Sequence, residues 1–184
     1  MSHDALKPVR EYRTRGERLL IGLMTGTSAD ATDAVLVRVI GDGLTATHEV
    51  LAELERPLDD ALRHEVLELA GAATLEPERL MRLEVELAEV YATAVEAVCA
   101  QAGVALRDVT AIGSHGQTVR HVPRAAGRGR AYSLQLGSPA TLAERTGLTV
   151  VSDFRRRDTD AGGEGAPLVP IADWWLFRSP SESR

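Results

Sequence analysis

The chain has 184 residues, of which 44% are hydrophobic and 26% charged, and it carries a formal net charge of -6 at pH 7. This length and balance are typical of a globular domain with a buried core and argue against a largely disordered chain. The negative charge argues against a general nucleic-acid-binding protein, because such proteins need a positive surface to neutralise phosphates. One cysteine excludes an internal disulfide, and no Cys/His cluster in the sequence has the spacing of a zinc site.

The N-terminal residues 1–18 contain no apolar core of the kind that a secretory signal needs. No run in the sequence approaches the roughly 20 apolar residues of a membrane span. We therefore expect a cytoplasmic protein with a flexible leader over residues 1–18, a folded region over 19–178 and a frayed end over 179–184.

Three strands are predicted first along the chain. Residues 19–24 form a short apolar run, and the turn-favouring residues 25–33 follow it at once. Residues 35–40 have the near-continuous apolar pattern of a strand buried on both faces, and Gly41-Asp42-Gly43 then turns the chain. With a third strand over residues 45–54, the sequence predicts an antiparallel meander.

Two helices are predicted next. Apolar residues recur every three or four positions over residues 58–69, and Gly71 ends this helix. A longer helix begins near residues 74–77 and stops at Gly103. Its apolar face comprises Leu80, Leu83, Leu87, Val90, Ala94 and Val98.

Strands alternate with a helix in the remainder of the chain. Short strands are predicted over residues 109–113, 132–136 and 148–151, with a polar loop over 123–130 and a helix over 139–146. A meander followed by this alternation predicts an α/β fold, a mixed sheet with an antiparallel three-strand meander and packed helices.

The first polar motif is the run from Gly22 to Asp33. Backbone N–H groups and the hydroxyls of Thr27 and Ser28 can donate to phosphate oxygens, and Asp30 or Asp33 can hold magnesium through water. The motif is neither a Walker A loop nor a dinucleotide-binding loop. An ordinary hairpin turn has the same composition, so both readings stay open.

The second polar motif, residues 112–121, directly follows a predicted strand, where open α/β sheets bind ligands. His115 can act as an acid or base, or only donate a hydrogen bond in a loop. Gln117 and Thr118 suit recognition of a polar ligand such as a sugar.

The third polar motif, residues 151–168, also follows a predicted strand. Its three arginines and three aspartates fit either a ligand site or a solvated surface network. In the GGEGAP run over residues 162–167, three glycines let the backbone pass close to a bound molecule. From the residues alone, Asp158 is the natural candidate for a general base.

Together and in this order, the motifs GLMTGTSADATD, IGSHGQTVRH and LTVVSDFRRRDTDAGGEGAPLVP resemble those of the anhydro-N-acetylmuramic acid kinase family. The similarity runs from about residue 20 to residue 170. The resemblance implies an actin-like, hexokinase-type (ribonuclease H-like) fold, in which residues 19–178 are the N-terminal lobe of a two-lobed sugar kinase whose C-terminal lobe is absent.

The resemblance also implies a function in peptidoglycan recycling and amino sugar metabolism. Such a kinase uses ATP and Mg²⁺ to convert anhydro-N-acetylmuramic acid to N-acetylmuramic acid 6-phosphate. The implied phosphate-binding residues are Gly26, Thr27, Ser28, Ala29, Asp30, Ala31, Thr32 and Asp33. The residues implied to face the sugar and its lactyl carboxylate are His115, Gln117, Thr118 and Arg157.

Departures from the family pattern limit these implications. The family's catalytic aspartate lies in a GxDxGPGN-type motif that these 184 residues lack, so the catalytic residue is unknown and we expect no turnover by this chain alone. Ala31 replaces a glycine of the family loop, and Glu164 replaces a glutamine. A separately encoded C-terminal lobe and a homodimer are further expectations. The alternatives are a non-catalytic sugar-binding or regulatory remnant and a lobe of another actin-like sugar kinase.

Overall fold

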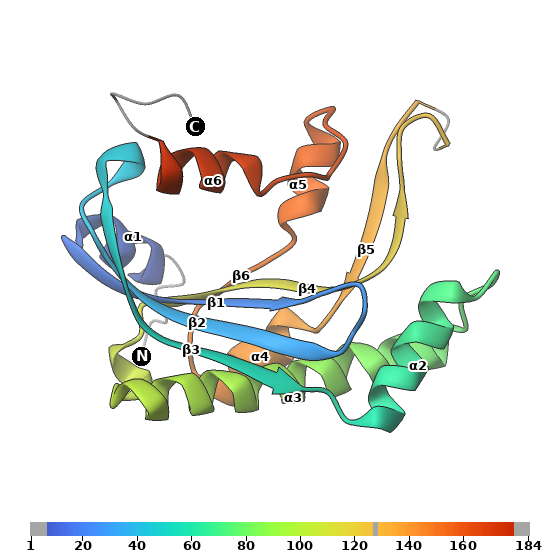
Figure 1. Cartoon of the computed structure of the whole chain (residues 1–184), viewed down its shortest axis with the longest axis horizontal. Coiled ribbons are helices and arrows are strands. Elements are labelled where there is room, and N and C mark those ends of the chain that lie inside the picture. The colour runs from blue at the N-terminus through green and yellow to red at the C-terminus, as the bar shows by residue number, and fades with distance from the viewer. Residues whose placement is uncertain (1–6, 127–128, 179–184) are drawn as a thin grey trace. The chain divides into compact units, whose positions relative to one another are not determined.

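The computed structural model describes residues 7–126 and 129–178 (Figure 1). Two compact units divide the chain, and each is described by itself. The first, here called the sheet unit, comprises Met1–Val119 and Gln135–Ser152. The second, called the hairpin unit, comprises Arg120–Leu134 and Asp153–Arg184. This division crosses the region 19–178, which the family resemblance implies to be one lobe.

The sheet unit begins with the meander that the sequence predicts. Strands β1 (Glu17–Thr25), β2 (Ala31–Ile40) and β3 (Thr47–Pro57) pair antiparallel in that order. A short 3₁₀ helix at Gly43–Thr45 connects the second and third strands. The predicted antiparallel meander is therefore confirmed, and the parallel pairs described next make the sheet mixed, as predicted.

Parallel pairing extends the sheet on the other side of β1. Strand β4 (Ala111–Val122) pairs parallel with β1, and β6 (Val150–Val151) pairs parallel with β4. Strand β5 (Tyr132–Leu136) is also hydrogen-bonded to β4. A second 3₁₀ helix at Leu106–Asp108 precedes β4. β4 is much longer than the predicted strand over residues 109–113, so it includes the whole second motif.

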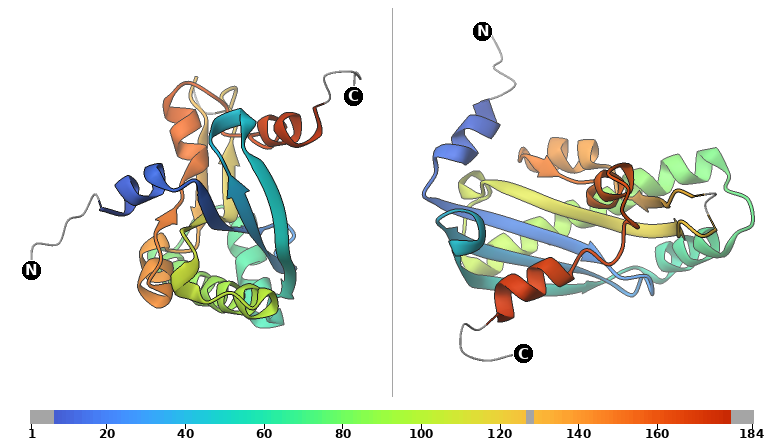
Figure 2. Two further views of the ribbon diagram at one scale, coloured as in Figure 1. Left: turned by 90° about the vertical axis from the view of Figure 1, so that its left-hand side faces the viewer. Right: turned by 90° about the horizontal axis from the view of Figure 1, so that it is seen from above.

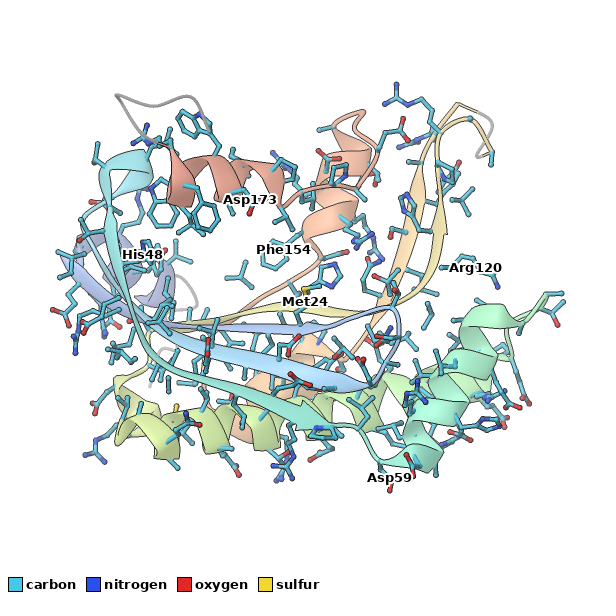
Figure 3. All side chains as sticks on the ribbon, viewed as in Figure 1. Met24, His48, Asp59, Arg120, Phe154 and Asp173 are labelled. Carbon is cyan, nitrogen blue, oxygen red and sulfur yellow. The ribbon has the colours of Figure 1, made fainter. Side chains whose placement is uncertain are left out.

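The helices of the sheet unit are close to those predicted. In α2 (Asp60–Gly71) the carboxylate of Asp59, labelled in Figure 3, accepts from the Ala61 N–H at 2.9 Å and caps the first turn. α3 (Pro77–Ala102) starts at a proline and ends at Gly103, whose φ of 66° is the left-handed conformation that glycine favours. α4 (Pro139–Thr146) has the predicted bounds.

The core of the sheet unit lies between one face of the sheet and helices α3 and α4, which run side by side across that face (Figures 1 and 2). Ile21, Leu36 and Ile112 are completely buried there. The buried face of α3 comprises Leu83, Leu87, Ala88, Tyr91, Ala92, Ala94, Val95, Val98 and Cys99. Leu83, Leu87, Ala94 and Val98 of the predicted face are buried, and Leu80 and Val90 are partly buried.

The predicted leader is partly regular. Lys7–Thr14 form helix α1, and β1 begins at Glu17 rather than after residue 18. The buried guanidinium of Arg18 lies over the Tyr12 ring, donates to the carbonyls of Tyr12 and Gly41, and pairs with Asp42. Arg18 thus joins α1 to the segment that follows β2, and the helix belongs to the sheet unit. Residues 1–6 and the predicted frayed end at 179–184 lie outside the described residues.

The hairpin unit contains helices α5 (Phe154–Asp160) and α6 (Pro170–Phe177). Half of the Trp174 side chain is exposed on α6. Within residues 7–126 and 129–178, no helix has the length and hydrophobicity needed to cross a membrane.

Candidate functional site

The loop between β1 and β2 is a tight turn over residues 26–30. The Ala29 N–H donates to the Gly26 carbonyl at 3.0 Å, and Ala29 has a φ of 48°. This left-handed conformation costs a residue with a side chain about 1 to 2 kcal/mol, so the complete burial of the Ala29 methyl group must hold the turn in place. The turn leaves Thr27 and Ser28 exposed to solvent.

Asp30 organises this turn. One carboxylate oxygen, Oδ1, accepts from the Ser28 hydroxyl at 2.9 Å and from the Ala31 N–H at 3.0 Å. The Ser28 hydrogen bond lowers the pKa of Asp30, because it favours the ionised form. Ala31, which replaces the glycine of the family loop, has no positive φ, and it pairs with Pro57 as the first residue of β2.

A buried hydroxyl network anchors the start of the turn. The Thr25 hydroxyl donates to the Tyr91 hydroxyl at 3.0 Å and lies 3.4 Å from that of Thr32. All three side chains are at most 2% exposed. Burial raises the pKa of Tyr91 to about 12, so the phenol stays protonated. α3 thereby fixes both strands that carry the turn.

The second motif is part of strand β4 and not a loop after a strand. Gly116 lies within β4 with a φ of 75°, and a Cβ there would lie 2.6 Å from the Leu136 carbonyl oxygen of β5. Only glycine fits this position, because both the backbone angle and the neighbouring strand exclude a side chain. Beside it, His115 places Nδ1 2.8 Å from the Gly116 carbonyl. The sequence pattern does not indicate this continuation, because glycine between polar residues is typical of loops.

The pairing of β1 with β4 brings the first two motifs together. Thr25 is the register partner of Gln117, after a shift in the pairing that follows Leu23. Since the strands run parallel, the turn after Thr25 and the residues after Gln117 lie at the same end of the sheet. This adjacency is the arrangement that a shared ligand site requires.

Gln117 has an unsatisfied atom in this arrangement. Its side chain is 1% exposed, its Nε2 donates to the Thr118 carbonyl at 3.1 Å, and its Oε1 has no hydrogen-bond partner among the described residues. A buried acceptor without a partner costs about 1 to 3 kcal/mol, so a donor from a ligand would stabilise this site. The Thr118 hydroxyl accepts from Gln135 of β5 at 3.2 Å.

The turn between β5 and α4 also belongs to this cluster, although none of its residues is among the site residues predicted from the sequence. Glu84 accepts from the Gly137 N–H at 3.1 Å, and its pKa is raised because α3 and the turn bury its carboxylate. A Cβ on Gly137 would lie 2.4 Å from the Tyr91 ring. Ser138 caps α4 by accepting from the Thr141 N–H. Tyr91 is four residues after Leu87 on the buried face of α3, and this helical spacing was the only indication in the sequence that Tyr91 faces the core near Gly137.

The third motif folds within the hairpin unit around Asp158. Its Oδ2 accepts from the Gly165 N–H at 2.7 Å, and a Cβ on Gly163 would lie 2.1 Å from the same oxygen. The glycines of GGEGAP therefore let the backbone close around this carboxylate. Asp158 stabilises the loop, which makes it a poor candidate for the general base suggested by the residues alone.

Two other residues of this motif are also placed within the hairpin unit. The Glu164 carboxylate accepts from the Arg124 N–H at 3.0 Å and pairs with its guanidinium at 3.1 Å, so an arginine neutralises the negative charge that replaces glutamine. Arg157 is exposed on α5. Of the predicted site residues, the structure thus brings together the turn and the Gln117 region, while Arg157 belongs to the other unit.

Comparison with known proteins gives a consistent result. The sequence model described as anhydro-N-acetylmuramic acid kinase matches residues 18–184. A protein of that name from Caldanaerobacter subterraneus is 43% identical to this chain over 91% of its residues. Those from Bordetella petrii and Bordetella pertussis are 49% and 51% identical over 90% and 87% of this chain. The matches span 43%, 42% and 40% of those relatives, so the chain covers less than half of their length. The chain belongs to the anhydro-N-acetylmuramic acid kinase family.

Proposed function

We propose that these 184 residues supply the phosphate loop and the sugar-side strand of a kinase that converts anhydro-N-acetylmuramic acid to N-acetylmuramic acid 6-phosphate in peptidoglycan recycling. The observation that carries the proposal is the register pair of Thr25 and Gln117, because it sets the two family motifs side by side. The strand order β3-β2-β1-β4, with β6 beside β4, supports the finer assignment of the lobe as ribonuclease H-like and actin-type.

In this proposal the turn from Gly26 to Asp33 holds the phosphates of ATP. The exposed hydroxyls and the N–H groups of the turn are suitable donors to phosphate oxygens. Because the Tyr91 hydroxyl holds Thr25 at the start of the turn, little reorganisation would accompany binding. The ionised Asp30 fits Mg²⁺, which takes one or two carboxylates together with phosphate oxygens; Asp33 is the second candidate. The ion would neutralise charge on the transferred phosphoryl group.

The sugar side consists of His115, Gln117, Thr118 and Arg157 in the same proposal. Oε1 of Gln117 is an acceptor for a sugar hydroxyl or amide, and the Thr118 hydroxyl is held in place by Gln135. Arg157 provides a guanidinium for the lactyl carboxylate. The group that activates the attacking water is proposed to lie in the part of the family sequence outside the match.

Calorimetry with anhydro-N-acetylmuramic acid and with Mg-ATP tests the two sides separately. Thr118→Val keeps the shape of the side chain but removes its hydroxyl, and we expect about a tenfold weaker affinity for the sugar and an unchanged affinity for the nucleotide. Ser28→Ala should give the reverse pattern. Equal effects of both substitutions on both ligands would refute the assignment of the two motifs.

Kinase assays separate the proposed function from a non-catalytic sugar-binding role. We expect phosphorylation of the anhydro sugar only when the complementary part of a family member is present with this chain. Sugar binding without turnover under that condition would favour a binding or regulatory module. Turnover by the 184 residues alone would refute the dependence on the second part.

A further inference from the structure

One face of the sheet in the sheet unit is not covered by α3 and α4. It carries a groove of about 550 Å³ across four strands. Its lining is apolar and includes Leu20, Gly22, Val35, Val37, Gly113 and Val151. Met24, labelled in Figure 3, points from β1 to this side and is 47% exposed. A face of this composition is unusual for a surface that stays in contact with water.

Two glycines deepen the middle of this groove. Gly22 and Gly113 are register partners on neighbouring strands, so the face lacks two side chains at adjacent positions. A Cβ on Gly22 would lie 3.2 Å from the Val35 side chain. The depression therefore has room for a bulky side chain that comes from outside the sheet, rather than for side chains of the sheet itself.

One edge of the groove is acidic. In register, Asp33 pairs with Glu55 and Val35 pairs with Glu53. Cross-strand partners project to the same face, so the three carboxylates lie beside the apolar lining on the β2–β3 side. A segment that covers the groove should therefore carry basic residues along the side that faces β3.

Helix α1 covers only one end of the groove. Val9 and Tyr12 contribute to its lining, and both remain partly exposed. Since Arg18 fixes α1 through Tyr12, this short helix does not reach across the four strands. Within the described residues of the sheet unit, the rest of this apolar surface has no covering helix.

We propose that an amphipathic helix from the second part of the family's polypeptide docks in this groove, with bulky apolar side chains over Gly22 and Gly113 and a basic edge facing Glu53 and Glu55. Helices are the usual cover for the second face of a sheet with parallel strands. The curated relatives have more than half of their length outside the match, which provides such an element. This inference rests on family membership and not on the proposed activity.

The test is co-expression of the full 184-residue chain with the unmatched C-terminal part of the Bordetella petrii relative. Sedimentation velocity should detect a one-to-one complex. Val37→Asp places a charge in the groove and should weaken the complex by a factor of about ten or more. Val151→Asp, at the other end of the groove, should have the same effect and serves if Val37→Asp does not fold.

Met81→Asp on α3 is the matched control, because Met81 is 63% exposed on a helix outside the groove. It should leave the complex unchanged. No complex, or a complex that tolerates both groove substitutions, would overturn the proposal. A dimer of the 184-residue chain alone that Val37→Asp dissociates would also overturn it, since a second copy would then occupy the groove. Kinase activity is not measured, so failure here is distinct from failure of the proposed function.

Discussion

Tyr91→Phe is the sharpest test of the link between α3 and the first turn. The substitution removes one oxygen atom and leaves the ring, whose packing against Gly137 fixes the β5–α4 turn. The lost atom accepts the hydrogen bond from Thr25 at the end of β1. Any effect therefore reports on the hydroxyl network rather than on the volume of the core.

The expected loss of stability follows from the burial of the network. A net hydrogen bond contributes about 1 kcal/mol, and a buried donor left without a partner costs about 1 to 3 kcal/mol. The Thr32 hydroxyl lies 3.4 Å from that of Thr25 and can take over part of the role. We therefore expect Tyr91→Phe to lower the free energy of unfolding by about 1 to 2 kcal/mol.

Urea unfolding followed by circular dichroism measures this difference. Tyr132→Phe is the control, because that side chain is 55% exposed and its hydroxyl can bond to water in both states. It should change the stability by less than about 0.5 kcal/mol. If Tyr91→Phe costs no more than Tyr132→Phe, the hydroxyl does not anchor the turn and the reasoning is refuted.

Two further substitutions test the same cluster. Gly137→Ala should lower the free energy of unfolding in urea by about 2 to 4 kcal/mol, because the φ of 117° and the Tyr91 ring both exclude a methyl group. The control is Gly147→Ala, which has a φ of 70° but open space around it and should cost only about 1 kcal/mol. Equal costs would contradict the contact between Gly137 and Tyr91. Burial raises the pKa of Glu84 above its usual 4.5, so the unfolded chain loses this proton first and stability falls as pH rises from 4.5 through the folded pKa. Glu84→Gln should reduce this fall in unfolding midpoints measured across the range, and an unchanged pH profile would refute the role of burial.

The sequence was a reliable guide wherever local rules decide the structure. Alternating apolar residues and the Gly41–Gly43 turn were sufficient for the meander, and the helix over residues 139–146 has the predicted bounds. Gly103 ends α3 as predicted, because the residue that ends a helix often has a left-handed backbone angle, which glycine adopts readily. In each case the determining residues are neighbours in the chain.

The candidate site was predicted by motif but not by geometry. The turn after Thr25 and the Gln117 region were identified from their sequence motifs. Their adjacency, however, depends on the parallel pairing of β1 with β4. The roles of Tyr91 and Glu84 were missed, because a helical apolar period does not show which of its residues contact a distant turn. The placement of Arg157 relative to the turn stays a prediction.

The α/β order, the meander, the family resemblance and the three polar motifs can all be identified from the amino-acid sequence. Tertiary structure alone decided that β4 continues through Gly116, that the GGEGAP glycines close on Asp158, and that one sheet face retains an apolar groove. One property of glycine explains all three cases. A glycine in the sequence shows that the backbone can adopt an unusual angle or a close approach, but only the fold determines which atom it approaches.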